Sequence, residues 1–312
     1  MSQFSRKDRF WGEIIYGIMW LFGQLPAWWH YFWSFLLSYV LQYLVGYRRE
    51  VVRDQLALSL PEKSEEERCE IERGVYRHLC DIAVEYIMLA GFSRRAMLRH
   101  LESDNIRDLL GELHEKGHKN VFLVLGHYGN WEWLSGFQAM LPMTQLYVLY
   151  QRQHGIANFL LYKLRSKFGT QLLEKRESVR DILRLKDDQD PKTVIFVADQ
   201  SPGLNSIHLF VDFMKRETAM YTGMESLARK LRCPVVYADI WRPKRGHYRL
   251  EGEMMTEDAS QLPEWQLSAD FMRRLEKTIM RQPELWLWSH RRWKHSYESV
   301  KRAYPHKELA KL

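Results

Sequence analysis

The chain contains few cysteines, and none of them stands in a metal-binding pattern. Its 312 residues include only Cys69, Cys80 and Cys233, and no two of these form a C-x-x-C pair. An odd count without such spacing argues against a disulfide framework and against a zinc site. We therefore expect a reducing compartment and no bound metal.

Charged residues are missing from a long segment near the amino terminus. No Asp, Glu, Lys or Arg occurs from Ile14 to Tyr47. This run exceeds the roughly 18 residues that indicate a membrane-spanning helix. As one straight helix it would reach roughly 50 Å, and Gly23 and Pro26 offer a break. Residues 1–47 are thus predicted to be a membrane segment, either one anchor or a shallow hairpin; the alternative is a buried helical hairpin.

Three other absences narrow the class of protein. No small-residue cleavage site follows the apolar run, which argues against a removed signal peptide. Despite a net charge of +7, the sequence lacks a helix-turn-helix, an RNA-binding signature and a zinc motif, and its basic residues are spread. Basic proteins favour anionic partners, so we expect a membrane surface or an acidic partner and no nucleic acid.

From residue 48 to residue 312 the pattern is that of an α/β domain. Short apolar runs, expected to be strands, lie at 120–125, 144–150, 193–198, 234–240 and 247–251. Helical patterns cover 48–60, 131–140, 155–168, 177–186, 222–231 and 266–281. A further long helix is expected to begin at a Ser64–Glu67 capping box. Such alternation predicts a mostly parallel central sheet with helices on both faces.

A histidine follows the first apolar run, where ligands gather in open α/β folds. The sequence VFLVL at 121–125 leads into GHYGNWEW. Gly129 frees the backbone and Asn130 is a good helix cap, which places Glu132 in the first helical turn. His127 can then fold back so that Glu132 orients one ring nitrogen and the other acts as a base. A loop histidine beside a solvated Glu132 is the alternative.

Four stretches in order carry a resemblance to one family. They read GHYGNWEW at 126–133, FVADQSPG at 196–203, VDFMKRETAMYTGMESLARKLRCPVV at 211–236 and PELWLWSHRRWK at 283–294. Together with the uncharged amino-terminal segment they resemble the bacterial lipid A biosynthesis acyltransferases, the late lauroyl- and myristoyl-transferases of the H-x(4)-D/E glycerolipid acyltransferase superfamily. The resemblance implies transfer of a fatty acyl group from acyl carrier protein, or from coenzyme A in some relatives, to a hydroxyl of a lipid A precursor.

The resemblance also implies roles for single residues. His127 is implied as the general base and Glu132 as its orienting partner. Asp199 matches an acidic position of the family's active site, although it also suits a turn at a strand end. Arg165 matches the family's arginine position, and Arg152 competes with it because the intervening segment aligns ambiguously.

Basic and aromatic residues near the carboxyl end suit an anionic lipid headgroup. Arg291 and Arg292 can pair with phosphates, and Trp286 and Trp288 alternate with them at an expected interfacial edge. In the alternative, the tryptophans are core and the arginines form structural salt bridges. Met214 stands where the family usually has a glycine, which loosens any inference about the acceptor pocket.

The expected reaction is direct transfer in a ternary complex without a metal or redox cofactor. Its expected partners are a membrane lipid acceptor, acyl carrier protein and the surface of the inner membrane, with the catalytic domain on the cytoplasmic face. Two other functions remain open. One is acylation of another membrane lipid, such as an aminoacyl lipid or a glycolipid, and the other is a non-catalytic basic membrane-surface binding protein. The sequence sets no acyl chain length.

Overall fold

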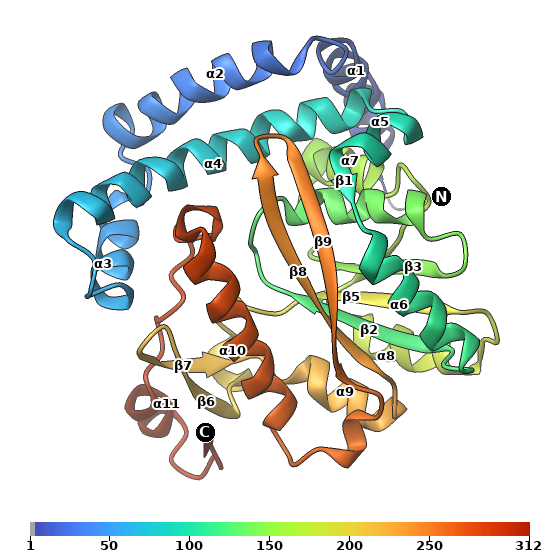
Figure 1. Ribbon diagram of the computed structural model, residues 1–312, viewed down its shortest axis with the longest axis vertical. Coiled ribbons are helices and arrows are strands. Elements are labelled where there is room, and N and C mark those ends of the chain that lie inside the picture. Colours follow the sequence, from blue (N-terminus) through green and yellow to red (C-terminus); the bar gives the residue numbers. More distant parts are fainter. Residues whose placement is uncertain (1–3) are drawn as a thin grey trace.

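The amino-terminal segment forms two helices that pack against a third, long helix. The computed structural model describes residues 4–312, and in it α2 (Ala27–Tyr39) runs along α4 (Glu65–Gly91), whereas α1 (Arg6–Phe22) packs against the carboxyl-terminal end of α4 (Figure 1). The break falls between Phe22 and Ala27, as Gly23 and Pro26 predict. A short π-helical segment, Val40–Leu44, follows α2.

Close backbone contact holds this pair against α4. A Cβ atom on Gly23 would lie 2.7 Å from the backbone nitrogen of Gly91, and one on Gly91 would lie 2.5 Å from the carbonyl oxygen of Gly23. The chain can approach α4 this closely because both residues lack a side chain. Within residues 4–312 no helix combines the length and the apolar character needed to cross a bilayer. The membrane segment predicted at residues 1–47 is therefore not confirmed.

A seven-stranded sheet forms the centre of the molecule, in the order β1-β9-β8-β2-β5-β3-β4. Its strands are β1 (Leu101–Glu102), β2 (Asn120–Leu125), β3 (Gln145–Tyr150), β4 (Gln171–Glu174), β5 (Lys192–Val197), β8 (Val235–Lys244) and β9 (His247–Thr256). Neighbours run parallel except for the β8–β9 hairpin, so the mostly parallel sheet is confirmed. β1 and β4 were not expected from the sequence because they are short and only partly apolar.

Helices cover both faces of this sheet. Glu253 on β9 pairs with Arg274 of α10 (Gln266–Arg281), whereas the neighbouring Gly252 lies against Ile106 of α6 (Asp104–Glu115). Successive strand residues point to opposite faces, so α6 and α10 pack on opposite sides. The other helices are α3 (Arg49–Ser59), α5 (Arg94–His100), α7 (Gly155–Arg165), α8 (Ser178–Arg184), α9 (Gly223–Leu231) and α11 (Tyr297–Ala303).

A second, smaller sheet was not foreseen. It joins β6 (Leu209–Phe213), β7 (Arg216–Met220) and β10 (Ala310–Lys311) in the order β10-β6-β7. The β6–β7 hairpin turns at Met214 and Lys215, which have φ of 52° and 60°. This left-handed conformation suits glycine, so Met214 occupies a strained turn position. Its backbone N–H donates to Glu276 at 2.8 Å, which helps to fix the turn.

Candidate active site

The sheet register brings a histidine and an aspartate together. β2 and β5 are parallel neighbours, and Leu125 is paired with Val197 at their carboxyl ends. His127 and Asp199 each follow two residues later, so the two side chains emerge at the same edge of the sheet. β2 is central and its residues Val121 to Leu125 are at most 1% exposed. The edge is therefore held by a rigid, fully buried strand.

The carboxylate of Asp199 binds His127 twice. His127 Nδ1 lies 2.5 Å from Asp199 Oδ1, and the His127 backbone N–H donates to Oδ2 at 2.9 Å. Trp286 Nε1 donates to the same Oδ2 at 2.8 Å. Burial alone would raise the pKa of Asp199, but the charge of His127 and these hydrogen bonds outweigh it and lower that pKa to about 2. Asp199 is thus an ionised acceptor for Nδ1–H.

The second ring nitrogen of His127 faces a cavity. The imidazole side chain is 16% exposed, and its Nε2 lies 3.2 Å from the side-chain amide of Gln200. Because Nδ1 is held by Asp199, the neutral ring keeps its lone pair on Nε2. Chemically this is a base that can accept a proton from a group in the cavity.

Glu132 has a different partner from the one predicted. Its two carboxylate oxygens accept hydrogen bonds from Nε and Nη2 of Arg165, at 2.8 and 2.7 Å. We predicted that His127 donates to Glu132, and this was wrong. The register between β2 and β5 instead places Asp199 beside the ring. Burial alone would raise the pKa of Glu132, but Arg165 outweighs burial and holds that pKa below its ordinary value. Glu132 nevertheless lines the same cavity as His127.

Of the two competing arginines, only Arg165 reaches this place. It ends α7, and its side chain lines the cavity. Arg152 lies exposed in the loop that follows β3. The bidentate pair with Glu132 is the strong geometry for guanidinium and carboxylate, so it fixes both groups at the cavity wall.

Asn130 caps the short helix that carries Glu132, as predicted. Its Oδ1 accepts the backbone N–H groups of Glu132 and Trp133, both at 3.1 Å. The helix Trp131–Met140 is a 3₁₀ helix rather than an α-helix. Asn130 itself is buried and does not line the cavity, so its part is to hold the backbone.

The aromatic stretch at residues 283–294 contacts the backbone of the loop that carries His127. Tyr128 is bridged to Trp286, and the backbone N–H of Leu287 donates to the carbonyl of His127 at 3.2 Å. Trp286 and Trp288 are 3% and 0% exposed, so they belong to the core rather than to an interfacial edge. Of these two tryptophans, Trp286 contacts Asp199 through its indole N–H.

The two neighbouring arginines of this stretch differ. Arg291 is exposed, whereas Arg292 is 1% exposed and donates from Nη1 to the carbonyl of Ala219. Because Arg292 is buried, it cannot pair with a phosphate at the surface as we expected. Its Nε and Nη2 have no hydrogen-bond partner within residues 4–312, so a structural salt bridge does not describe it either.

Sequence reasoning missed two residues beside the histidine. Gln200 faces His127 Nε2, and His290 accepts the backbone N–H of Ser201 at its Nε2 at 3.1 Å. Burial lowers the pKa of His290 to about 4, which keeps its ring neutral as an acceptor. Gln200 directly follows Asp199 in FVADQSPG, and that adjacency is the one signal that marked it.

The cavity at His127 has a volume of about 380 Å³, and both apolar and polar side chains line it. Its apolar wall comes from β3, α7, α8, β5 and α9 through Val148, Leu149, Leu161, Val179, Phe196, Val197, Met224 and Leu227. Its polar groups, besides His127, Glu132 and Arg165, include Gln200, Lys175 and Tyr221. Such a space suits an apolar chain whose reactive end lies at the histidine. In the part of the chain that the structure describes, no cluster of His, Cys, Asp or Glu could hold a metal ion.

These features define an α/β fold in which a histidine, paired with a buried aspartate, borders a cavity with an apolar wall. The family model for bacterial lipid A biosynthesis acyltransferases matches residues 2–295, and the chain belongs to that family. The protein is therefore an acyltransferase. A comparison with curated proteins finds no match.

Proposed function

We propose that the protein transfers a fatty acyl group from a thioester to a hydroxyl of a lipid A precursor, with His127 as the general base. The observation that carries this proposal is the arrangement of one imidazole. Its Nδ1 is held by a buried, ionised Asp199, and its Nε2 is open to a cavity with an apolar wall. The donor that we infer is an acyl carrier protein thioester, because a basic chain favours an acidic carrier.

In the proposed reaction the acceptor hydroxyl takes the place of the Gln200 amide beside Nε2. Its proton passes to His127, and its oxygen attacks the thioester carbonyl carbon. The carbon–sulfur bond then breaks, and the sulfur leaves as a thiol by taking the proton from the imidazolium. Asp199 keeps the ring in the productive tautomer and stabilises its positive charge, as the acid of a catalytic triad does.

The polar wall of the cavity completes the proposed mechanism. The backbone N–H groups of Glu132 and Trp133 are already bound by Asn130 and are not free for an oxyanion. We therefore assign the oxyanion to the side-chain donors that line the cavity, Gln200 and Arg165. Glu132 is assigned to the electrostatic stabilisation of the imidazolium, because its carboxylate lies on the same wall.

The amino-terminal helices support docking to a membrane surface. The buried residues of α2 are the polar His30, Ser34 and Ser38. Its outward side chains are large and apolar, namely Trp28, Phe32, Trp33, Phe35, Leu36, Leu37 and Tyr39. This is the reverse of a helix on a water-soluble surface, and a contiguous apolar patch of this kind marks an interaction surface. A helix of 13 residues is about 20 Å long, so we infer that it lies in the interface.

One of these helices, α1, contacts a helix that lines the proposed site. Gly12 of α1 lies against Phe159 of α7, and α7 contributes Leu161 and Arg165 to the cavity. A lipid acceptor held in the bilayer beside α1 and α2 would therefore be close to His127. We infer the cytoplasmic face of the inner membrane as the location, because an acyl carrier protein donor is found there.

Mass spectrometry tests the proposal. The purified protein is incubated with an acyl carrier protein thioester and a lipid A precursor in vesicles. We expect one additional acyl group on the precursor. We expect His127→Ala to fold but to lower the transfer rate by at least about 10³-fold, because it removes the base.

Three results would contradict the proposal. Near-normal transfer by His127→Ala would show that His127 is not the base. Acylation of an amino lipid or a glycolipid in place of the lipid A precursor would show that the acceptor is wrong. A protein that binds vesicles but transfers nothing would favour the non-catalytic membrane-binding alternative.

A further inference from the structure

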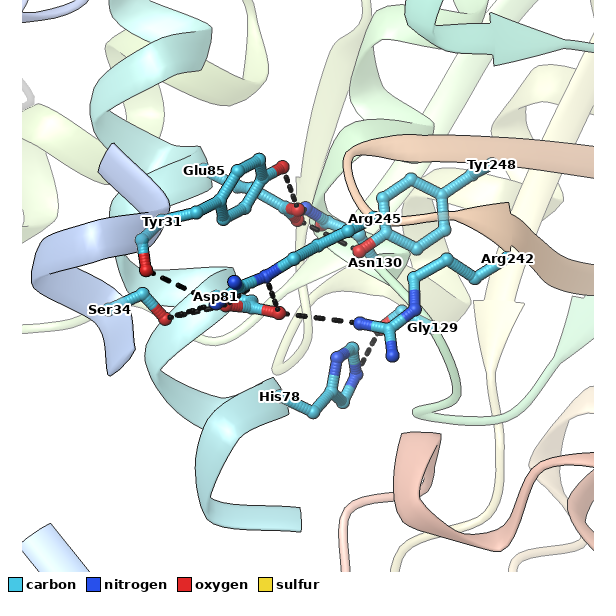
Figure 2. A network of polar contacts seen from close by, with 10 residues as sticks. All are labelled: Tyr31, Ser34, His78, Asp81, Glu85, Gly129, Asn130, Arg242, Arg245 and Tyr248. Atoms are coloured by element: carbon cyan, nitrogen blue, oxygen red, sulfur yellow. Dashed lines mark hydrogen bonds and ion pairs between the residues drawn. The ribbon is translucent and has the colours of Figure 1, made fainter. Parts of the chain in front are cut away.

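A buried polar network lies between the membrane-facing helix α2 and the loop that carries His127 (Figure 2). Its ten residues come from four places: Tyr31 and Ser34 on α2; His78, Asp81 and Glu85 on α4; Gly129 and Asn130 in the loop; and Arg242, Arg245 and Tyr248 on the β8–β9 hairpin. We call this set the α2–loop network. None of its residues lines the cavity, so the proposed chemistry does not use them directly.

Glu85 is the residue on which the network converges. Its side chain is fully buried and accepts hydrogen bonds from Tyr31, Asn130 and Tyr248, at 2.8, 2.5 and 2.9 Å. Each of these three donors belongs to a different element. A buried carboxylate with every partner in place is strongly tied to its position, because loss of one partner leaves a polar group unsatisfied.

Asn130 connects Glu85 to the proposed site. Its Nδ2 donates to Glu85, while its Oδ1 caps the helix that begins with Trp131 and carries Glu132. Trp133 Nε1 also donates to the backbone carbonyl of Glu85, at 3.2 Å. Rotation of the Asn130 amide would therefore release the start of this helix, four residues after His127.

His78 holds the residue next to Asn130 in the same loop. Its Nε2 lies 3.1 Å from the carbonyl oxygen of Gly129, a residue with φ of +59°. Burial lowers the pKa of His78 to about 3, so its ring is neutral and donates one proton to this carbonyl. Glu85 and His78 stand on the same helix, α4, which thus fixes the loop at two points.

On the opposite side, α2 enters the network through two residues. The Tyr31 hydroxyl donates to Glu85, and the Ser34 hydroxyl donates to Asp81 at 2.5 Å. Arg245 binds Asp81 and lies 4.4 Å from the Tyr31 ring centroid. The position of α2 is therefore coupled to Glu85 by a directed hydrogen bond.

We propose that Glu85 is a positioning residue for acyl transfer, which holds the His127 loop through Asn130 and ties its position to α2 through Tyr31. The inference rests on the proposed role of His127. The outward face of α2 is apolar, and its inward face carries the polar residues of the network. A lipid surface that covers the outward face would therefore also fix the position of Tyr31 on the inward face. Docking of α2 and alignment of the base are then one event.

The test compares single variants in vesicles of phosphatidylethanolamine and phosphatidylglycerol that contain a lipid A precursor, with an acyl carrier protein thioester as donor. Tyr31→Phe removes one hydroxyl and keeps the ring under Arg245, and we expect kcat to fall about fivefold. Glu85→Ala should lower kcat about 100-fold, the effect of a small misplacement of a reacting group. Glu85→Gln keeps one acceptor oxygen and should recover part of that loss. The KM for the donor should stay unchanged in all three.

Ser38→Ala is the matched control. Ser38 lies on the same buried polar face of α2, but its hydroxyl donates to the carbonyl of Phe35 within its own helix, at 2.7 Å. We expect wild-type kcat from this variant, and thermal unfolding of every variant shows whether it is folded.

The inference is overturned if Tyr31→Phe and Glu85→Gln keep wild-type kcat while wild type is active and His127→Ala is not. It is also overturned if these variants raise the KM for the donor and leave kcat unchanged. A wild-type protein that transfers nothing would overturn the proposed function and this inference with it. The two failures are thus separated by the activity of wild type.

Discussion

Two buried carboxylates border the same loop, and their environments move their pKa values in opposite directions. Asp199 and Glu85 are 2% and 0% exposed. The pKa of Asp199 is lowered to about 2, whereas burial and the neighbouring charge of Asp81 raise the pKa of Glu85 to about 7. Burial is common to both groups, so burial does not set the difference.

The hydrogen-bond partners and neighbouring charges set the difference between the two pKa values. Asp199 faces an imidazole that can carry a positive charge and receives two further N–H groups. Glu85 receives only neutral donors and lies near another acid. A nearby cation favours the ionised carboxylate, and a nearby anion disfavours it. The surroundings of Asp199 therefore keep it charged beside the proposed base His127, whereas those of Glu85 favour its neutral form in a structural network.

Replacement of Asp199 is expected to have the largest effect on the transfer rate, and it tests whether Asp199 differs in role from Glu85. Asp199→Asn keeps the size of the side chain but removes its charge and lets the ring adopt the wrong tautomer. We expect the transfer rate to fall by about 10³- to 10⁴-fold in a folded protein, measured by steady-state kinetics. Asp239→Asn is the control, because Asp239 pairs with Arg281 outside the cavity of His127. An Asp199→Asn rate within tenfold of wild type would contradict the role assigned to Asp199.

The pH dependence of stability gives a smaller effect that sharpens the comparison. The pKa of Glu85 is raised from 4.5 to about 7 in the folded state, so its contribution to stability is fully present below about pH 4.5 and is lost as the pH rises through about 7. Urea unfolding should show the free energy of unfolding of wild type falling over this range relative to Glu85→Gln, by on the order of 2 kcal/mol. Asp199, with its lowered pKa, contributes stability that is lost only as the pH falls below about 4 towards 2. Parallel curves for wild type and Glu85→Gln between pH 4.5 and 7 would remove the difference between the two carboxylates.

Most of the central fold could be predicted from the sequence because its signals are local. The strands 120–125 and 193–198 are continuous apolar runs, and the helix from Gln266 to Arg281 repeats at helical spacing. β1, β6, β7 and β10 are short or carry charged residues such as Asp212, and they form only because neighbours pair with them. Their prediction needs the tertiary structure.

The site could be predicted only in part, for the same reason. The spacing of His127, Asn130 and Glu132 is local, and it correctly predicted the helix cap. The partner of His127 depends on the register between β2 and β5, which are separated by a long stretch of sequence. Equal offsets from the two strand ends, two residues each, are the signal that would have favoured Asp199. The burial of Arg292 has no such signal, because its basic neighbours Arg291 and Lys294 are exposed.

The central claim is that Asp199 fixes the tautomer of His127 and leaves Nε2 as the base. Nitrogen NMR of ¹⁵N-histidine-labelled protein measures this directly, with the His127 signals identified by their loss in His127→Ala. At about pH 8, where an ordinary imidazole is neutral, we predict that the proton resides on Nδ1 in wild type and that this preference is lost in Asp199→Asn. A proton on Nε2 of wild type, or an equal mixture of tautomers in both proteins, would contradict the account.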